Sequence, residues 1–269
     1  MKSTKKSVLL GEIQSFAVVS DVHMRSPEDE QTHLFVKCLQ ELAKVDVLFC
    51  LGDIFDFVFA GDSFYVSHWN KVFSAFADLQ RRGTRVVFLE GNHDFGFEHF
   101  LHEKLKESFS VAADAEAVCT HPVLGEIVLR HGDDIVCPWH YLWFRRLVKA
   151  RVFQRITKLV PGRATNFFFN FYAQLSRKTD VYRALDPAYL WRCVGNFLRS
   201  RSGRGVSQPD VLVLGHVHQH VDALWHSTRV VIGEDWFSAP NILMANSSGQ
   251  VSRQYLTPVQ TEPWREAWQ

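Results

Sequence analysis

The chain has 269 residues, is 46% hydrophobic and 22% charged, and carries a formal net charge of +1. This length is enough to bury a full hydrophobic core, and the near-neutral balance excludes a protein whose whole surface attracts polyanions. There is no run of ~18 apolar residues, and the apolar stretch near the N-terminus is too short for a signal peptide, so we expect a cytoplasmic protein without a transmembrane helix. Its five cysteines are scattered without a C-x-x-C pair, which indicates reduced thiols.

Apolar runs that alternate with amphipathic stretches characterise the first part of the chain. We expect buried strands at residues 15–20, 45–51 and 85–89, with helices near 28–44 and 64–82 between them. Strands that alternate with helices form βαβ units, and these units build a parallel sheet. The predicted fold class is therefore α/β.

The later part of the chain combines closely spaced strands with one unusual segment. Strands are expected at 126–130, 210–214, 228–232 and 241–245, and the close spacing of the last few indicates a second, partly antiparallel sheet. Residues 139–178 contain no acidic residue, nine Lys or Arg and ten Phe, Tyr or Trp. We therefore expect one domain over residues 1–269, with a helical cap insertion over 138–200 and a flexible loop near 200–208.

Five polar clusters each follow a strand-like run. In open α/β sheets, ligands bind beyond the carboxyl ends of the strands, so these clusters should meet at one edge. Any single cluster is more readily explained as a turn or a surface histidine, but all five together favour a metal site. The clusters are Asp21-Val22-His23, Gly52-Asp53-Ile54-Phe55-Asp56, Gly91-Asn92-His93-Asp94, His131-Gly132-Asp133-Asp134 and Gly215-His216-Val217-His218.

The donor atoms in these clusters restrict the chemistry. Carboxylates, imidazoles and an amide oxygen favour Mn, Fe or Zn. The D-x-H and H-x-H spacings let alternate side chains point the same way from extended backbone. One carboxylate can bridge two ions ~3.5–4 Å apart, which is the geometry for in-line phosphoryl displacement. The residues therefore predict a two-metal phosphoesterase.

The order D-x-H, G-D-x-x-D, G-N-H-D, H-G-D and G-H-x-H resembles that of the calcineurin-like metallophosphoesterases over roughly residues 16–237. This resemblance implies a four-layer αββα sandwich that holds two divalent ions. It implies that His93 protonates the leaving oxygen or stabilises developing charge, and that Asp94 orients His93. The implied ligands are Asp21, His23 and His218 for one ion, Asn92, His131 and His216 for the other, and Asp53 as the bridge.

A finer resemblance concerns the substrate. The segments 52–57, 131–134 and 233–237 are similar to those of UDP-2,3-diacylglucosamine hydrolases, the lipid A pathway pyrophosphatases of Gram-negative bacteria. The resemblance implies cleavage of this lipid-linked nucleotide sugar to UMP and 2,3-diacylglucosamine 1-phosphate, typically with manganese. It matches Tyr141, Arg177 and Lys178 to substrate-binding positions. The basic and aromatic insert would face acyl chains and the inner leaflet of the inner membrane, as a peripheral contact.

Three other hypotheses stay open. A nuclease or nucleotide phosphodiesterase of the same superfamily would also use interleaved basic and aromatic residues, although the near-neutral charge argues against a stable nucleic acid partner. A non-catalytic scaffold would have lost ligands, whereas every ligand position here is filled. A protein Ser/Thr phosphatase would need an open groove for a peptide, whereas the apolar insert indicates a covered pocket.

Overall fold

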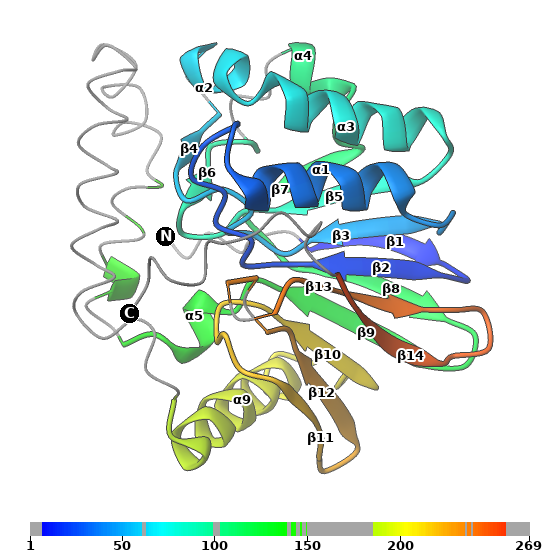
Figure 1. The fold of residues 1–269 in the computed structure, drawn as a ribbon. Helices are drawn as coiled ribbons and strands as arrows, with labels where there is room; N and C mark the ends of the chain where they lie inside the picture. Colours follow the sequence, from blue (N-terminus) through cyan, green and yellow to red (C-terminus); the bar gives the residue numbers. More distant parts are fainter. Residues whose placement is uncertain are drawn as a thin grey trace.

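The computed structural model describes residues 7–60, 63–98, 103–138, 141–143, 146, 149, 185–234, 236–237 and 239–256. Within these ranges, two six-stranded sheets pack face to face, and helices cover the outer face of each sheet (Figure 1). The order helix, sheet, sheet, helix confirms the predicted αββα sandwich. Most of the expected cap lies outside the described residues. Among the described residues, no helix is both long and apolar enough to span a lipid bilayer.

The first sheet is centred on the three strands that the early apolar runs predicted. β2 (Phe16–Val19), β3 (Val47–Cys50) and β5 (Arg85–Leu89) lie side by side and parallel, and β7 (Val111–Ala113) continues the parallel arrangement. β13 (Asn241–Ala245) pairs antiparallel with β2, and β14 (Val251–Tyr255) pairs antiparallel with β13. The expectation that all the late strands share the second sheet is therefore wrong for β13, because the chain returns to the first sheet after residue 234.

The second sheet has the order β1-β8-β9-β10-β12-β11. It mixes parallel pairs with the antiparallel pairs β8/β9 and β12/β11, as expected for a partly antiparallel sheet. A separate two-stranded sheet pairs β4 (Val58–Phe59) with β6 (Asp94–Phe95). The strands of the second sheet are β1 (Val8–Glu12), β8 (Ala117–His121), β9 (Gly125–Arg130), β10 (Val211–Leu214), β11 (Val221–Trp225) and β12 (Thr228–Ile232).

Side chains that cap the first turn set where two of the longer helices begin. α1 (Glu30–Glu41) starts after Asp29, whose carboxylate accepts a hydrogen bond from the Thr32 N–H at 2.7 Å. α9 (Pro187–Ser202) has the same kind of N-cap at Asp186 and a proline in its first turn. The helix predicted over 64–82 is two helices, α2 (Ser63–His68) and α3 (Asn70–Arg81), which meet at the buried Trp69. The described helices also include α4 (Glu103–Lys106) and α5 (Asp133–Val136).

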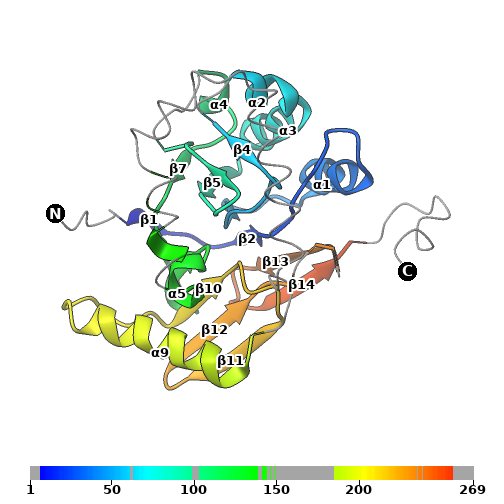
Figure 2. The ribbon, with the colours of Figure 1, turned by 90° about the vertical axis from the view of Figure 1, so that its left-hand side faces the viewer.

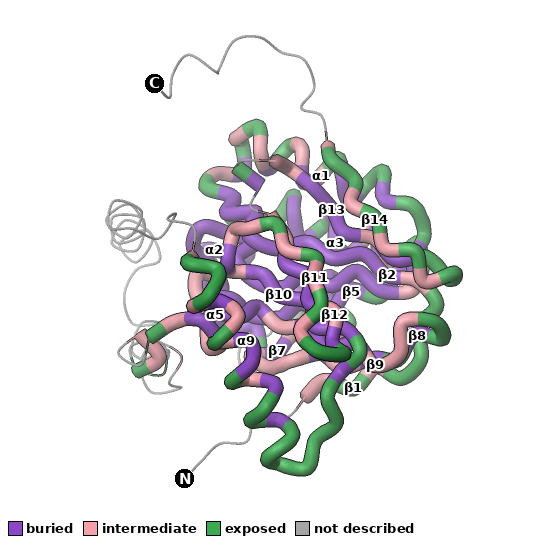
Figure 3. Tube along the Cα trace, turned by 90° about the horizontal axis from the view of Figure 1, so that it is seen from below, coloured by how far each residue is buried: buried purple, intermediate pink, exposed green. Residues whose placement is uncertain are grey.

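Alternation along each strand produces three hydrophobic cores between the four layers. In β2, Ala17 and Val19 face α1, whereas Phe16 and Val18 face the second sheet. Successive side chains on a strand point to opposite faces, so a strand that is covered on both sides becomes apolar throughout. Figure 3 shows the tube buried along β2, β5 and β10, and more exposed along the edge strands β11 and β14.

The outer helix α9 begins inside the range expected for the cap and ends inside the range expected for a loop. Leu190, Val194 and Leu198 of α9 belong to the same buried cluster as Val128 and Leu212 of the second sheet. Figure 2 shows α9 on the outer face of this sheet, on the opposite side of the sandwich from α1 and α3. Residues 187–200 are therefore part of the sandwich itself, because their apolar stripe covers a sheet face.

Glu116 joins α9 to the second sheet. Its two carboxylate oxygens each lie 2.7 Å from Nη1 of Arg201, and its Oε2 lies 3.1 Å from Nη1 of Arg130. The Ser7 hydroxyl also donates to Oε1 at 2.8 Å. Partial burial opposes ionisation, but these bonds hold the pKa of Glu116 below its usual range.

We expect Glu116→Gln to lower the free energy of unfolding by about 3 kcal/mol, because the buried Arg201 loses the carboxylate that neutralises it. The control Asp222→Asn disrupts a more exposed pair with Arg229 and should cost less than ~1 kcal/mol. Because the folded-state pKa of Glu116 is depressed, its stabilisation is present at neutral pH and is lost as the pH falls below about 4.3. Urea unfolding at pH 7 and pH 4 measures both effects; equal losses in the two variants would contradict this role.

Candidate metal centre

The five polar clusters follow five different strands and meet where the two sheets adjoin. Three clusters follow β2, β3 and β5 of the first sheet, and two follow β9 and β10 of the second. Backbone hydrogen bonds join the loops: the Asp21 N–H donates to the Gly52 carbonyl at 3.2 Å, and the Gly215 N–H donates to the His131 carbonyl at 2.9 Å. The predicted convergence of the clusters at one edge is therefore present in the structure.

The backbone of these loops is unusual. Of the six non-glycine residues with positive φ in the described ranges, five are predicted metal ligands. The D-x-H and H-x-H spacings predict side chains that project from extended backbone, but in the structure these side chains belong to left-handed loop residues that follow the strand ends. Such residues cost of order 1–3 kcal/mol each and persist where the surroundings determine the conformation, most often at functional sites. The five are Asp21, His23, Asp53, His216 and His218, with φ between 52° and 64°.

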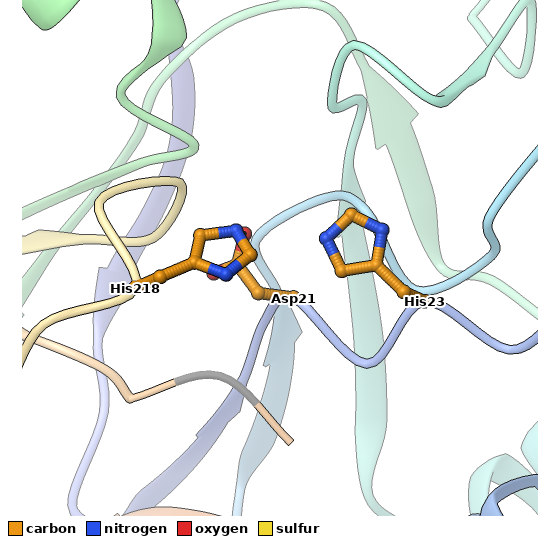
Figure 4. A group of neighbouring side chains, drawn as sticks. All are labelled: Asp21, His23 and His218. Carbon is orange, nitrogen blue, oxygen red and sulfur yellow. The ribbon is translucent and has the colours of Figure 1, made fainter. Parts of the chain in front are cut away.

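Asp21, His23 and His218 form the first group of converging side chains (Figure 4). Their potential ligand atoms lie within 4.8 Å of one another, and Nε2 of His218 is 3.4 Å from Oδ1 of Asp21. The Asp21 carboxylate also accepts the backbone N–H of His216 at 2.9 and 3.0 Å. These contacts bring the loop after β2 and the loop after β10 to the same point.

Asp53, His131 and His216 form a second group, and Asn92 lies beside it. The Nε2 atom of His131 is 3.4 Å from Oδ2 of Asp53 and 2.9 Å from Oδ1 of Asn92. The other ring nitrogen, Nδ1, donates to the Leu51 carbonyl at 2.7 Å, which turns Nε2 toward the cluster.

Asp53 links the two groups. Its Oδ2 atom lies 3.4 Å from His131 Nε2 and 3.9 Å from His23 Nε2, so one oxygen lies between imidazoles of both groups. Its Oδ1 atom accepts the backbone N–H of His93 at 2.9 Å, which fixes the carboxylate plane. The side chain is 2% exposed. This placement is the one expected of a carboxylate that bridges two cations.

The charges of the cluster fit a cation. Burial opposes ionisation of Asp21 and Asp53, but neighbouring histidines lower the pKa of Asp21 to about 2 and hold that of Asp53 well below its usual range. Burial lowers the pKa of His23 to about 3 and that of His216 to about 4, so these rings are neutral, which is the form that can bind a cation. Burial opposes the charged form of His131 too, but Asp53 raises its pKa to about 10.

Several ring nitrogens in the cluster are buried without a hydrogen-bond partner. Buried polar atoms are almost always paired, so such a set indicates ligand atoms for a bound group. Together with two buried, ionised carboxylates, the set fits divalent metal ions and not a neutral ligand. The nitrogens are Nδ1 and Nε2 of His23 and Nδ1 of His216.

Two glycines allow the loops to approach each other. A Cβ on Gly91 would lie 2.1 Å from Oδ1 of Asp53, and a Cβ on Gly52 would lie 2.5 Å from the Gly91 backbone. Gly52 also has a φ of +82°, which disfavours other residues. The glycines of the G-D and G-N motifs are therefore part of the geometry that places Asp53.

His93 and Asp94 have different surroundings from those expected. The Nδ1 atom of His93 donates to the Asp56 carbonyl at 2.7 Å, and it is this contact that orients the ring. The Asp94 carboxylate instead accepts four backbone N–H groups of residues 53–55 and 91, at 2.7 to 3.3 Å. Burial raises the pKa of Asp94 to about 8, with a further contribution from Asp53. Asp94 thus fastens the loops that carry Asp53 and Asn92, and its expected bond to His93 is absent from the described contacts.

The predicted substrate-binding residues are only partly described. The Tyr141 hydroxyl donates to Asp133 at 3.4 Å, and its ring lies 6.5 Å from that of His216, so it borders the cluster. Arg177 and Lys178 lie outside the described residues.

Three neighbours of the cluster have no role in the prediction from sequence. Phe237 is 39% exposed and stacks on His23 with ring centroids 5.9 Å apart. The Asp56 carboxylate lies 3.8 Å from Nδ1 of His23, and its place in the G-D-x-x-D motif was the available signal. Cys137 contacts His216, and nothing in its sequence context indicated this.

Comparison with known proteins agrees with this geometry. Residues 15–220 match the family described as calcineurin-like phosphoesterase. The chain belongs to this family. It is a metal-dependent phosphoesterase, and the clustered His and Asp side chains are the potential ligands of its divalent metal.

The chain aligns with curated relatives over nearly their full lengths. UDP-2,3-diacylglucosamine hydrolase of Vibrio parahaemolyticus is 27% identical over 86% of this chain and 94% of its own. The protein of the same name from Pasteurella multocida is 26% identical over 87% and 95%. Among solved structures, an archaeal phosphodiesterase is 12% identical with a TM-score of 0.45, covering 90% of this chain and 99% of its own. That structural likeness is too weak to support an argument about function.

We expect Gly91→Ala to weaken Mn²⁺ binding by ~10–100-fold and to lower hydrolysis of a generic phosphodiester by ~10²-fold, because the added methyl group displaces Asp53. The control Gly203→Ala adds a methyl group at the end of α9, where the nearest atom is 3.5 Å away. Titration calorimetry with Mn²⁺ measures binding. Wild-type affinity in Gly91→Ala would show that this close approach does not determine the position of the carboxylate.

Proposed function

We propose that this phosphoesterase hydrolyses the diphosphate of UDP-2,3-diacylglucosamine, with UMP and 2,3-diacylglucosamine 1-phosphate as products. The observation that supports the reaction class is the position of Asp53, between two groups of buried metal ligands at the junction of the sheets. Support for the substrate comes from the relatives that bear this name and align over more than nine-tenths of their lengths.

The proposed ligand sets follow the two groups of side chains, with Asp53 common to both. When bound, two divalent ions stabilise the charge that develops on the phosphoryl oxygens and lower the cost of forming the nucleophile. Oxygen and imidazole donors suit Mn²⁺, which we propose as the metal, and also admit Fe or Zn. Asp21, His23 and His218 would hold one ion, and Asn92, His131 and His216 would hold the other.

His93 is the proposed proton donor to the leaving oxygen. Its Nδ1 atom is engaged by the Asp56 carbonyl, which leaves Nε2 available for substrate. Its ring lies edge-on to that of His23, with centroids 5.0 Å apart, and is partly exposed. A histidine beside the ligands, and not itself a ligand, can transfer a proton without releasing a metal ion.

We propose that the basic and aromatic segment 139–178 binds the lipid part of the substrate. Its composition supports contact with acyl chains and with an anionic surface, and so a peripheral position at the cytoplasmic face of the inner membrane. Tyr141 and Phe237 border the metal ligands and supply aromatic surface next to the reacting phosphate. Arg177 and Lys178 are the proposed cationic contacts of this segment.

The substrate proposal is tested by measuring UMP release from UDP-2,3-diacylglucosamine with Mn²⁺ and mild detergent. We expect release from the acylated substrate and at least ~10²-fold less from UDP-N-acetylglucosamine, because only the former engages the apolar segment. Equal rates on both substrates would show that the acyl chains do not contribute to substrate specificity. Release from neither, with cleavage of single-stranded oligonucleotides, would favour the nuclease alternative.

We expect His93→Ala to lower kcat by ~10²–10⁴-fold while both metal ions remain bound, as removal of a general acid does. Metal content is measured by mass spectrometry on the same samples. The control His226→Ala alters an exposed turn residue between β11 and β12 and should leave both quantities unchanged. Loss of an ion from His93→Ala would identify this side chain as a ligand and refute its role as proton donor.

A further inference from the structure

Cys137 follows His131 in the chain and lies beside His216, another of the proposed metal ligands. The short helix α5 follows His131 and Gly132, and Cys137 is its C-terminal flanking residue, in extended conformation. Its Sγ atom lies 3.2 Å from Nε2 of His216, across 79 residues of sequence. The Cys137 N–H donates to the Asp133 carbonyl at 3.0 Å, so the end of α5 fixes the backbone that carries the thiol.

The two nitrogens of His216 have different surroundings. Nε2 faces the sulfur, whereas Nδ1 is buried and has no hydrogen-bond partner. A neutral imidazole has one donor nitrogen and one acceptor nitrogen, and a thiol sulfur can accept a weak hydrogen bond. If the hydrogen is on Nε2, it is directed at the sulfur, and the lone pair of Nδ1 remains available for a cation. The other tautomer would leave a buried N–H donor without an acceptor, which is costly.

His131 provides a parallel within the same group of ligands. Its Nδ1 atom donates to the Leu51 carbonyl, and its Nε2 atom faces Asp53 and Asn92. Each imidazole of this group thus has one nitrogen in contact with a protein group, and the second nitrogen of His216, Nδ1, is buried and without a hydrogen-bond partner. Groups that hold the outer nitrogen of a metal-binding histidine fix its tautomer and ring orientation.

The thiol is not itself placed among the ligands. Cys137 belongs to none of the three groups of potential metal ligands among the described residues. These groups are Asp21, His23 and His218; Asp53, His131 and His216; and His23, Asp53 and His93. The sulfur of Cys137 contacts Nε2 of His216, and the unpartnered nitrogen of that ring is Nδ1. This geometry distinguishes a residue that positions a ligand from one that binds the metal.

We propose that Cys137 is a positioning residue, which accepts a hydrogen bond from His216 Nε2 and thereby presents Nδ1 to the second metal ion. This inference rests on the proposed metal-binding role of His216, but not on the identity of the substrate. The residue acts through His216 and touches neither the metal ion nor the phosphate. The effect of replacing it should therefore appear first in metal affinity.

The test compares Cys137→Ala, which removes the acceptor, with Cys137→Ser, which restores a smaller one. We expect Cys137→Ala to weaken one of two Mn²⁺ sites by ~10–100-fold in titration calorimetry, and Cys137→Ser to recover affinity to within ~3-fold of wild type. The control Cys193→Ala removes another half-buried thiol, on α9, and should bind both ions as wild type does. The melting temperature of each metal-free variant shows whether it is folded.

Each outcome bears on the proposal. Wild-type affinity at both sites in Cys137→Ala would overturn it. Equal loss in Cys137→Ser and Cys137→Ala, with unchanged melting temperatures, would make the sulfur a ligand and also overturn it. Selective loss in Cys137→Ala with recovery in Cys137→Ser would support it, even if the protein released no UMP, because Mn²⁺ binding is measured without any substrate. Failure of both Mn²⁺ sites in the wild-type protein would instead refute the proposed metal centre.

Discussion

The burial of the Asp53 carboxylate is the constraint on which the rest of the site depends. A buried charged group is unstable unless it is neutralised or hydrogen-bonded, and the junction of the sheets provides both for this carboxylate. The His93 backbone amide holds one oxygen, while His131 and His23 face the other. Asp94, in turn, accepts the backbone N–H groups around Asp53 and fixes its loop. The neighbouring glycines are required because the loops approach too closely for a side chain.

Much of this cluster could be predicted from the sequence, because its potential metal ligands follow buried strands directly. Asp21, Asp53 and Asn92 come within three residues of the ends of β2, β3 and β5, and parallel strands place their carboxyl ends at one edge. The four-layer sandwich was implied by a family resemblance in the order of the motifs, and the two sheets with their outer helices confirm it.

Other features depend on contacts that a local pattern does not contain. β13 joins the first sheet through pairing with β2, more than 200 residues earlier in the chain. His93 is oriented by a backbone carbonyl, so no side-chain motif could reveal its partner. The break between α2 and α3 comes at Trp69, an apolar residue that fits a helical pattern but packs against Phe55 with ring centroids 5.0 Å apart. The sequence around Cys137 does not indicate a partner, and its contact with His216 becomes evident only in the folded chain.

The proposed ligands come from both sheets, and this limits how far one sheet can move relative to the other. Asn92 belongs to the loop after β5 of the first sheet, whereas His131 and His216 follow β9 and β10 of the second. A cation held by all three would act as a cross-link between the sheets. A slide of one sheet over the other by a fraction of a strand repeat, about 3.3 Å, would separate these ligands. Side chains of the inter-sheet core, such as Val18, Phe49 and Val213, therefore have to keep the two sheets aligned if the proposed ligands are to meet at one ion. Their sizes set the alignment of the two sheets, and with it the distance between the donor atoms.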